Sequence, residues 1–80
     1  MLTEYIRAAM RHALYEYWDD DKVFFGKIPQ LEGVLTTGKT LEECREELEE
    51  IVEDWLLLSL RKNLPIPMID GMSLEIKEAA

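Results

Sequence analysis

The feature that most constrains the fold is a helical repeat of apolar residues between positions 41 and 63. Seven such residues recur at steps of three and four: Leu41, Cys44, Leu48, Ile51, Val52, Trp55 and Leu58. This spacing places them on one stripe of an α-helix, which must pack on another element. Thr40 and Glu43 have the spacing of a capping box at the helix start. The sequence therefore predicts one helix over residues 41–63, about 33 Å long.

The residues before this helix predict an antiparallel meander of three strands. Residues 12–18 alternate in polarity and are rich in aromatic side chains, which favours a strand. A polar cluster at residues 19–22 turns the chain into a second strand over residues 23–28. Pro29 ends that strand because it has no N–H to donate. A short third strand is predicted over residues 34–37.

The two ends of the chain predict one further element each. Thr3 is suited to cap a short helix over residues 4–11. Asp70 and Gly71 form a turn dipeptide, and residues 73–77 then alternate in polarity, which predicts a fourth strand at a sheet edge. Together these elements predict a single α+β domain over residues 1–80, with the helices on one face of the sheet.

Composition excludes several classes of function. Nine basic against seventeen acidic residues give a net charge of −8, which repels phosphate backbones and favours a basic protein partner over nucleic acid. No stretch approaches the roughly 18 apolar residues of a membrane span. The single cysteine, Cys44, lies on the apolar stripe and is expected to be a small buried hydrophobe. We therefore expect a cytoplasmic protein that is not attached to a membrane.

The residues with catalytic or metal-binding chemistry do not form a recognisable set. Asp19, Asp20 and Asp21 could bind a cation, but adjacent turn carboxylates point in different directions, so a hydrated hairpin tip explains them better. His12 has no serine or cysteine placed beside it for nucleophilic catalysis. Cys44 combines a position near a helix start, which lowers a thiol pKa, with expected burial, which raises it. We predict no enzyme activity, no metal site and no cofactor.

Acidic residues are the strongest candidates for a binding surface. Several glutamates lie on the helix face away from the apolar stripe, where they would either be simply hydrated or contact a basic partner. The predicted partner-binding residues are those of the hairpin tip and of this helix face: Asp19, Asp20, Asp21, Glu46, Glu49 and Glu53.

The last two turns of the helix are apolar nearly all round. Leu57 and Leu60 fall roughly opposite Leu48 and Trp55 on a helical wheel, so this part of the helix should be covered on two sides. The second cover is expected to be another subunit, giving a dimer or tetramer, or else the proline-bounded connector that follows the helix.

Residues 25–48, together with the proline pair after the helix, resemble the HicB antitoxin family. The matching positions are Ile28, Pro29, Gly33, Gly38, Thr40, Glu43, Pro65 and Pro67. The resemblance implies a partial RNase H-like fold without nuclease activity, which binds and blocks a small RNA-cleaving toxin, HicA.

Two departures from the family pattern are visible. Lys39 stands where the family often has aspartate, and the sequence ends at Ala80, so we expect no C-terminal DNA-binding domain. The leading hypothesis is an antitoxin-like interaction domain that masks a basic HicA-type toxin. The alternative is a stand-alone oligomeric adaptor without a toxin.

Overall fold

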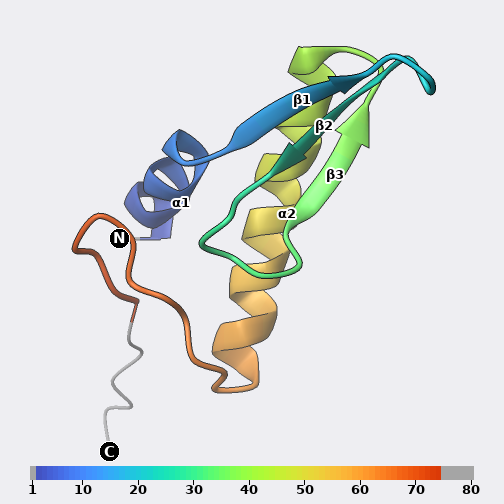
Figure 1. Ribbon diagram of the computed structural model, residues 1–80. Coiled ribbons are helices and arrows are strands. Elements are labelled where there is room, and N and C mark those ends of the chain that lie inside the picture. The colour runs from blue at the N-terminus through green and yellow to red at the C-terminus, as the bar shows by residue number, and fades with distance from the viewer. Residues whose placement is uncertain (1, 75–80) are drawn as a thin grey trace, which may run out of the picture.

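Three antiparallel strands pack one face on a long helix, and a short helix lies against that long helix (Figure 1). The computed structural model describes residues 2–74. The elements are α1 (Leu2–Arg11), β1 (Leu14–Trp18), β2 (Val23–Lys27), β3 (Leu35–Gly38) and α2 (Leu41–Arg61). The predicted α+β layout of short helix, meander and long helix is therefore confirmed.

The sheet has the order β1–β2–β3, as a meander requires. Leu14 pairs with Lys27 and Trp18 with Val23, and residues 19–22 form the predicted turn. The first strand is shorter than predicted because the His12 N–H donates to Ala9 C=O, which belongs to the end of α1. All five residues of β1 are exposed, because this edge strand has no helix over it.

The segment between β2 and β3 contributes three buried side chains to the core. Ile28 lies one residue beyond β2, and its N–H donates to Val34 C=O across 3.2 Å. Leu31 and Val34 are buried with it, whereas Pro29 is exposed and ends the strand as predicted. Gly33 has φ of 85°, a backbone conformation that other residues resist.

Helix α2 begins as predicted, with the Thr40 hydroxyl accepting from the Glu43 N–H at 3.0 Å. Among the described residues the Glu43 carboxylate makes no return bond, so only half of the capping box forms. The helix ends at Arg61, two residues earlier than predicted, with Lys62 as its C-cap.

The buried side of α2 differs from the predicted stripe. Its buried residues are Cys44, Leu48, Val52, Leu56 and Ser59. Leu41 and Leu58 are exposed, so their assignment to the buried stripe was wrong. Ile51 and Trp55 pack against the core but are only partly buried. The stripe is shifted because α2 is covered by the sheet along one side and by α1 along another.

The strands approach α2 so closely that two glycines are required. A Cβ on Gly38 would lie 2.5 Å from the backbone nitrogen of Cys44, and a Cβ on Gly26 would lie 3.0 Å from its sulfur. Both positions therefore face α2. Because side chains alternate along a strand, Leu14, Phe25 and Leu35 point to the opposite face of the sheet.

The segment after α2 folds back along α1. The Tyr5 hydroxyl donates to Pro67 C=O, and Ile69 is buried in the core. Ile69 and Met72 form an isolated bridge around the predicted Asp70–Gly71 turn. The predicted fourth strand is not formed at Ser73 and Leu74, and its remaining residues, 75–77, lie outside the described residues. Thr3 lies inside α1 and is not its cap, because the helix already starts at Leu2.

Within residues 2–74, neither helix has the combination of length and apolar character that crossing a membrane requires.

Candidate partner-binding surface

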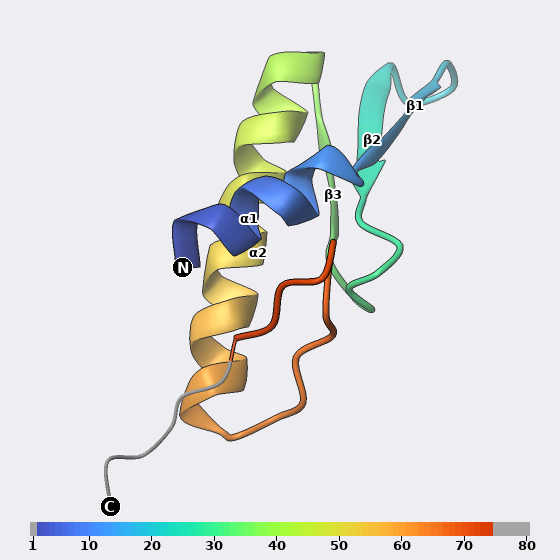
Figure 2. The same cartoon turned by 90° about the vertical axis from the view of Figure 1, so that its left-hand side faces the viewer.

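The hairpin tip and the first turns of α2, which are both acidic, lie at the same end of the molecule. The last residues of β3 lie beside the first turns of α2 at the upper end in both views, and the tip of the β1–β2 hairpin projects outward at the same end (Figures 1 and 2). The hairpin tip contributes Asp19, Asp20 and Asp21, all exposed. The start of α2 contributes exposed glutamates, while Lys22, Lys39 and Arg45 are the basic residues of this end. We call this region the acidic end.

A hollow lies at the acidic end between β3 and α2. Its volume is about 390 Å³. One wall is formed by Thr36, Thr37 and Gly38, and the other by four glutamates, Glu43, Glu46, Glu47 and Glu50. Glutamates one helical turn apart place their carboxylates on the same side, so the hollow concentrates negative charge. We call it the acidic groove; of its glutamates, only Glu46 was predicted as a partner-binding residue.

The strand that borders the acidic groove has one unpaired side. Within residues 2–74, β3 pairs with β2 alone. An unpaired strand edge exposes backbone N–H and C=O groups that an extended segment of another chain can bind. The acidic groove and this edge therefore lie together, so a basic extended segment could use both.

The other two predicted glutamates lie away from the acidic groove. Glu53 is exposed farther along α2. Glu49 lines a different hollow, of about 360 Å³, together with Arg7, Met10, Arg11 and Arg45. Of these three exposed glutamates, only Glu46 therefore borders the acidic groove.

The predicted oligomer residues are on the surface to different degrees. Leu57 is 48% exposed and Leu60 is partly buried. Leu56 and Ser59 on the same turns are buried, whereas Leu57 and Leu58 are exposed.

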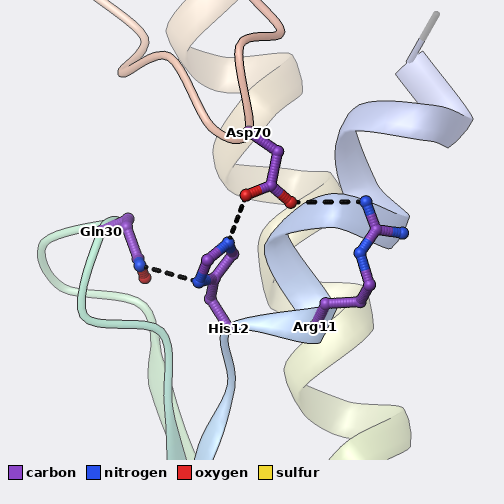
Figure 3. Close-up of polar contacts among 4 residues, drawn as sticks. All are labelled: Arg11, His12, Gln30 and Asp70. Atoms are coloured by element: carbon purple, nitrogen blue, oxygen red, sulfur yellow. Dashed lines mark hydrogen bonds and ion pairs between the residues drawn. The ribbon is translucent and has the colours of Figure 1, made fainter.

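Sequence reasoning missed a polar cluster that ties three segments together (Figure 3). His12 Nε2 lies 2.7 Å from Asp70 Oδ1, and the His12 Nδ1 lies 3.0 Å from Gln30 Nε2. Arg11 Nη2 contacts the second Asp70 oxygen at 3.4 Å. These residues are far apart in the sequence, so no local pattern could have indicated the cluster.

The cluster shifts the ionisation of its carboxylate. The hydrogen bond from His12, together with the charges of His12 and Arg11, lowers the pKa of Asp70 from its usual 3.8. A carboxyl whose pKa is lowered by folding stabilises the folded state above its unfolded pKa, and that contribution is lost as the pH falls through the lowered value. The cluster therefore anchors the turn at Asp70 to α1 at neutral pH.

We expect Asp70→Asn to weaken the pH dependence of stability below about pH 4. The parent should lose stability more steeply than the variant between about pH 4 and 2, because only the parent must protonate an Asp70 carboxylate that accepts from His12 and Arg11. Urea unfolding followed at several pH values measures this slope. Asp19→Asn, a change at the exposed hairpin tip, is the control. Equal slopes in the parent and Asp70→Asn would contradict the assignment.

The surroundings of Cys44 indicate a structural role for this residue. Cys44 is fully buried as predicted, its sulfur lies 3.9 Å from Thr36 C=O, and burial raises the pKa of the thiol. A thiol of this kind is a poor nucleophile. Among residues 2–74, no three histidine, cysteine or carboxylate side chains are grouped as metal ligands.

Several of the motif residues that carry the family resemblance pack, cap or connect the elements of the fold. Gly38 allows the contact between β3 and α2, Thr40 caps α2, and Ile28 is in the core. Pro65 and Pro67 lie in the connector that returns to α1, where Pro67 accepts the Tyr5 hydrogen bond. This pattern of residues therefore maintains the scaffold beneath the acidic end.

Comparison with known proteins identifies relatives of this scaffold. The family model described as UPF0150-like matches residues 4–67. A UPF0150 protein of Thermotoga maritima is 42% identical over 41 residues, which cover 51% of this chain and 55% of that protein. A second UPF0150 protein, from Synechocystis, is 37% identical over 54 residues, or 68% of this chain and 74% of that one. The match thus spans about half the length of the first relative.

A solved structure has the same fold over nearly the whole chain. The crystal structure of TTHA0281 from Thermus thermophilus is similar with a TM-score of 0.89 and 39% identity, covering 96% of this chain and 95% of the other. At this identity the likeness extends beyond the arrangement of helices and strands to the sequence itself. With a family model that matches from α1 to the proline-bounded connector, the chain belongs to the UPF0150-like family.

Proposed function

We propose that this chain is an antitoxin-like, non-enzymatic interaction domain that binds and masks a small basic toxin of the HicA type. The observation that carries the proposal is the acidic end, where the acidic groove lies beside an unpaired strand edge and the acidic hairpin tip projects from the same end of the molecule. The resemblance of the motif residues to the HicB family, with its partial RNase H-like fold, supports the same role. We further propose that the protein acts in the cytoplasm.

The acidic end has the chemistry that masking an RNA-cleaving protein requires. Such a toxin must bind a polyanion, so its active surface is positively charged. The glutamates of the acidic groove and the aspartates of the hairpin tip compete for that surface as an array of carboxylates. Complementary charge accelerates encounter, and backbone pairing along β3 would give the complex a fixed register.

We expect neutralisation of the acidic groove to slow association with the toxin. The triple variant Glu46→Gln, Glu47→Gln and Glu50→Gln should bind a short basic protein encoded beside this chain about tenfold more slowly at low salt, with a smaller change in dissociation. The triple variant Asp19→Asn, Asp20→Asn and Asp21→Asn tests the hairpin tip in the same way. Association rates at two salt concentrations provide the measurement.

A matched control separates the site from the overall charge. The variant Glu32→Gln, Glu53→Gln and Asp54→Asn changes the net charge by the same amount but leaves the acidic end intact, and should associate at nearly the parental rate. If this control and the groove variant slow association equally, the acidic groove is not the contact surface. If the parent itself does not bind the neighbouring protein, the masking role is wrong.

A second role, that of a stand-alone oligomeric adaptor, is favoured by exposed apolar residues. Leu57 and Leu58 on α2 are each 48% exposed, and Met68 in the connector is 65% exposed. Large apolar side chains that are left exposed are candidates for contact with another protein surface. Parental chain that self-associates but does not bind a basic neighbour would favour this role.

A further inference from the structure

The face of the sheet that points away from α2 has no cover within residues 2–74. Figure 2 shows α1 and α2 on one side of the three strands and no helix on the other. Alternation places eight side chains on this outer face: Leu14, Glu16, Trp18, Val23, Phe25, Lys27, Leu35 and Thr37. We call this set the outer face.

The outer face is mostly apolar. Leu14 is 55% exposed and Leu35 is 51% exposed, at opposite edges of the sheet. Between them the indole of Trp18 stacks on the ring of Phe25, with centroids 4.8 Å apart and planes 9° apart. Strands usually place polar residues on a face that remains in water, so an apolar outer face indicates a buried contact.

The outer face carries one acid and one base, and their positions restrict what can cover it. The strand pairing arranges these residues in a grid of two rows of three residues and a third row of two, because β3 ends at Gly38. The first row is Leu14, Lys27 and Leu35; the second is Glu16, Phe25 and Thr37; the third is Trp18 and Val23. Phe25 is at the centre, with Glu16 beside it on β1 and Lys27 next to it along β2.

We propose that the outer face binds the outer face of a second copy of this chain, with the strands of the two copies crossing at nearly a right angle. The two-fold axis of this dimer lies between the two sheets, passes over Phe25 and runs along the diagonal of the grid toward Leu14. It places Glu16 of each copy opposite Lys27 of the other. The same axis places Trp18 opposite Leu35 and Leu14 opposite Leu14 of the other copy. Orthogonal crossing is one of the two established ways in which sheets pack.

The other two-fold arrangements are disfavoured by charge. An axis along the strands places Lys27 over Lys27 of the second copy, and an axis across the strands places Glu16 over Glu16. The remaining diagonal places Glu16 over Val23 and Lys27 over Thr37, which buries both charges without a partner. Only the proposed axis satisfies both charges, and it also matches the large apolar residues, so a second copy is a complementary occupant.

The size of the outer face sets the strength of the contact. Three strands about 4.8 Å apart and about five residues long give a small interface compared with stable dimers. The dimer should therefore dissociate on dilution, with a dissociation constant on the order of 1 to 100 µM. It leaves Leu57 and the glutamate wall of the acidic groove uncovered, because these lie on α2, whereas Thr37 belongs both to the other wall of the groove and to the outer face.

Charge reversal tests the proposed pairing between copies. Glu16→Lys alone places like charges opposite each other and should raise the dissociation constant at least about tenfold, and Lys27→Glu alone should do the same. An equal mixture of the two variants should associate, because the two basic positions of one variant then face the two acidic positions of the other. Sedimentation equilibrium of each variant and of the mixture, with no other protein present, measures this.

Apolar variants provide the matched control. Leu35→Glu, on the outer face, should give monomers at concentrations where the parent is dimeric, whereas Leu57→Glu, on the exposed side of α2, should dimerise like the parent. Unchanged melting of dilute samples verifies that each variant is folded.

Three outcomes overturn the proposal. The first is a parent that is monomeric at about 500 µM, well above the expected dissociation constant. The second is a mixture of the charge-reversal variants that associates no better than its components. The third is a dimer that Leu57→Glu dissociates and Leu35→Glu does not. Toxin binding is not measured, so these outcomes are independent of the proposed function.

Discussion

Gly38→Ala should lower the free energy of unfolding by about 3 kcal/mol or more, although it adds a single methyl group. The new Cβ would lie 2.5 Å from the backbone nitrogen of Cys44 and 2.8 Å from its Cα. Both atoms belong to the first turn of α2, so they cannot rotate away as the end of a side chain can. The end of β3 must then separate from α2, which opens the acidic groove that these two elements form.

Urea unfolding of the variant measures this loss. Thr37→Ala, one residue earlier and on the outer face, is the control and should change stability by less than about 0.5 kcal/mol. A loss of less than about 1 kcal/mol in Gly38→Ala would show that β3 and α2 are not in close contact at this point.

Leu56→Ala should destabilise the protein by about 2–5 kcal/mol, and more than Trp55→Ala does. Leu56 is fully buried, so its truncation leaves a cavity in the core. Trp55 is only partly buried, so part of the space left by its side chain opens to water and fills. The predicted apolar stripe of α2 included Trp55 and left out Leu56. Urea unfolding of both variants measures the loss in the free energy of unfolding. An equal or larger loss for Trp55→Ala would show that Trp55 belongs to the buried stripe, as the sequence predicted.

The sequence predicted the elements of this fold better than it predicted which side of α2 is buried. Thr40 marks the helix start with a local hydrogen bond, and Pro29 ends a strand because it has no donor, so both signals act within a few residues. The last turns of α2 contain leucines at adjacent positions, including Leu56, Leu57 and Leu58. A helical wheel cannot choose between them, because the choice depends on where α1 and the connector pack.

The segment after α2 was harder to predict, because its structure also depends on which elements it packs against. Alternation over residues 73–77 is a strand pattern, but a strand also needs a partner edge, and the bridge between Ile69 and Met72 closes a tight turn before it.

Among the predicted binding residues, the hairpin aspartates and Glu46 lie at one end of the molecule, while Glu49 and Glu53 do not border the acidic groove. Which glutamates border the groove depends on how β3 packs beside α2, and this packing cannot be predicted from composition.

The hydrogen bond from Tyr5 to Pro67 links the first helix to the segment that follows the last one. With the contacts of His12 and Arg11 to Asp70, it makes α1 and the connector depend on each other for burial. Lifting the connector would break the hydrogen bond of Tyr5 and expose the buried Ile69, whereas the sheet would keep its contacts with α2. Amides of α1 and of the connector should therefore exchange with deuterium through one shared opening, although they lie near opposite ends of the sequence, and the strands beneath the acidic end should exchange through a slower, separate one.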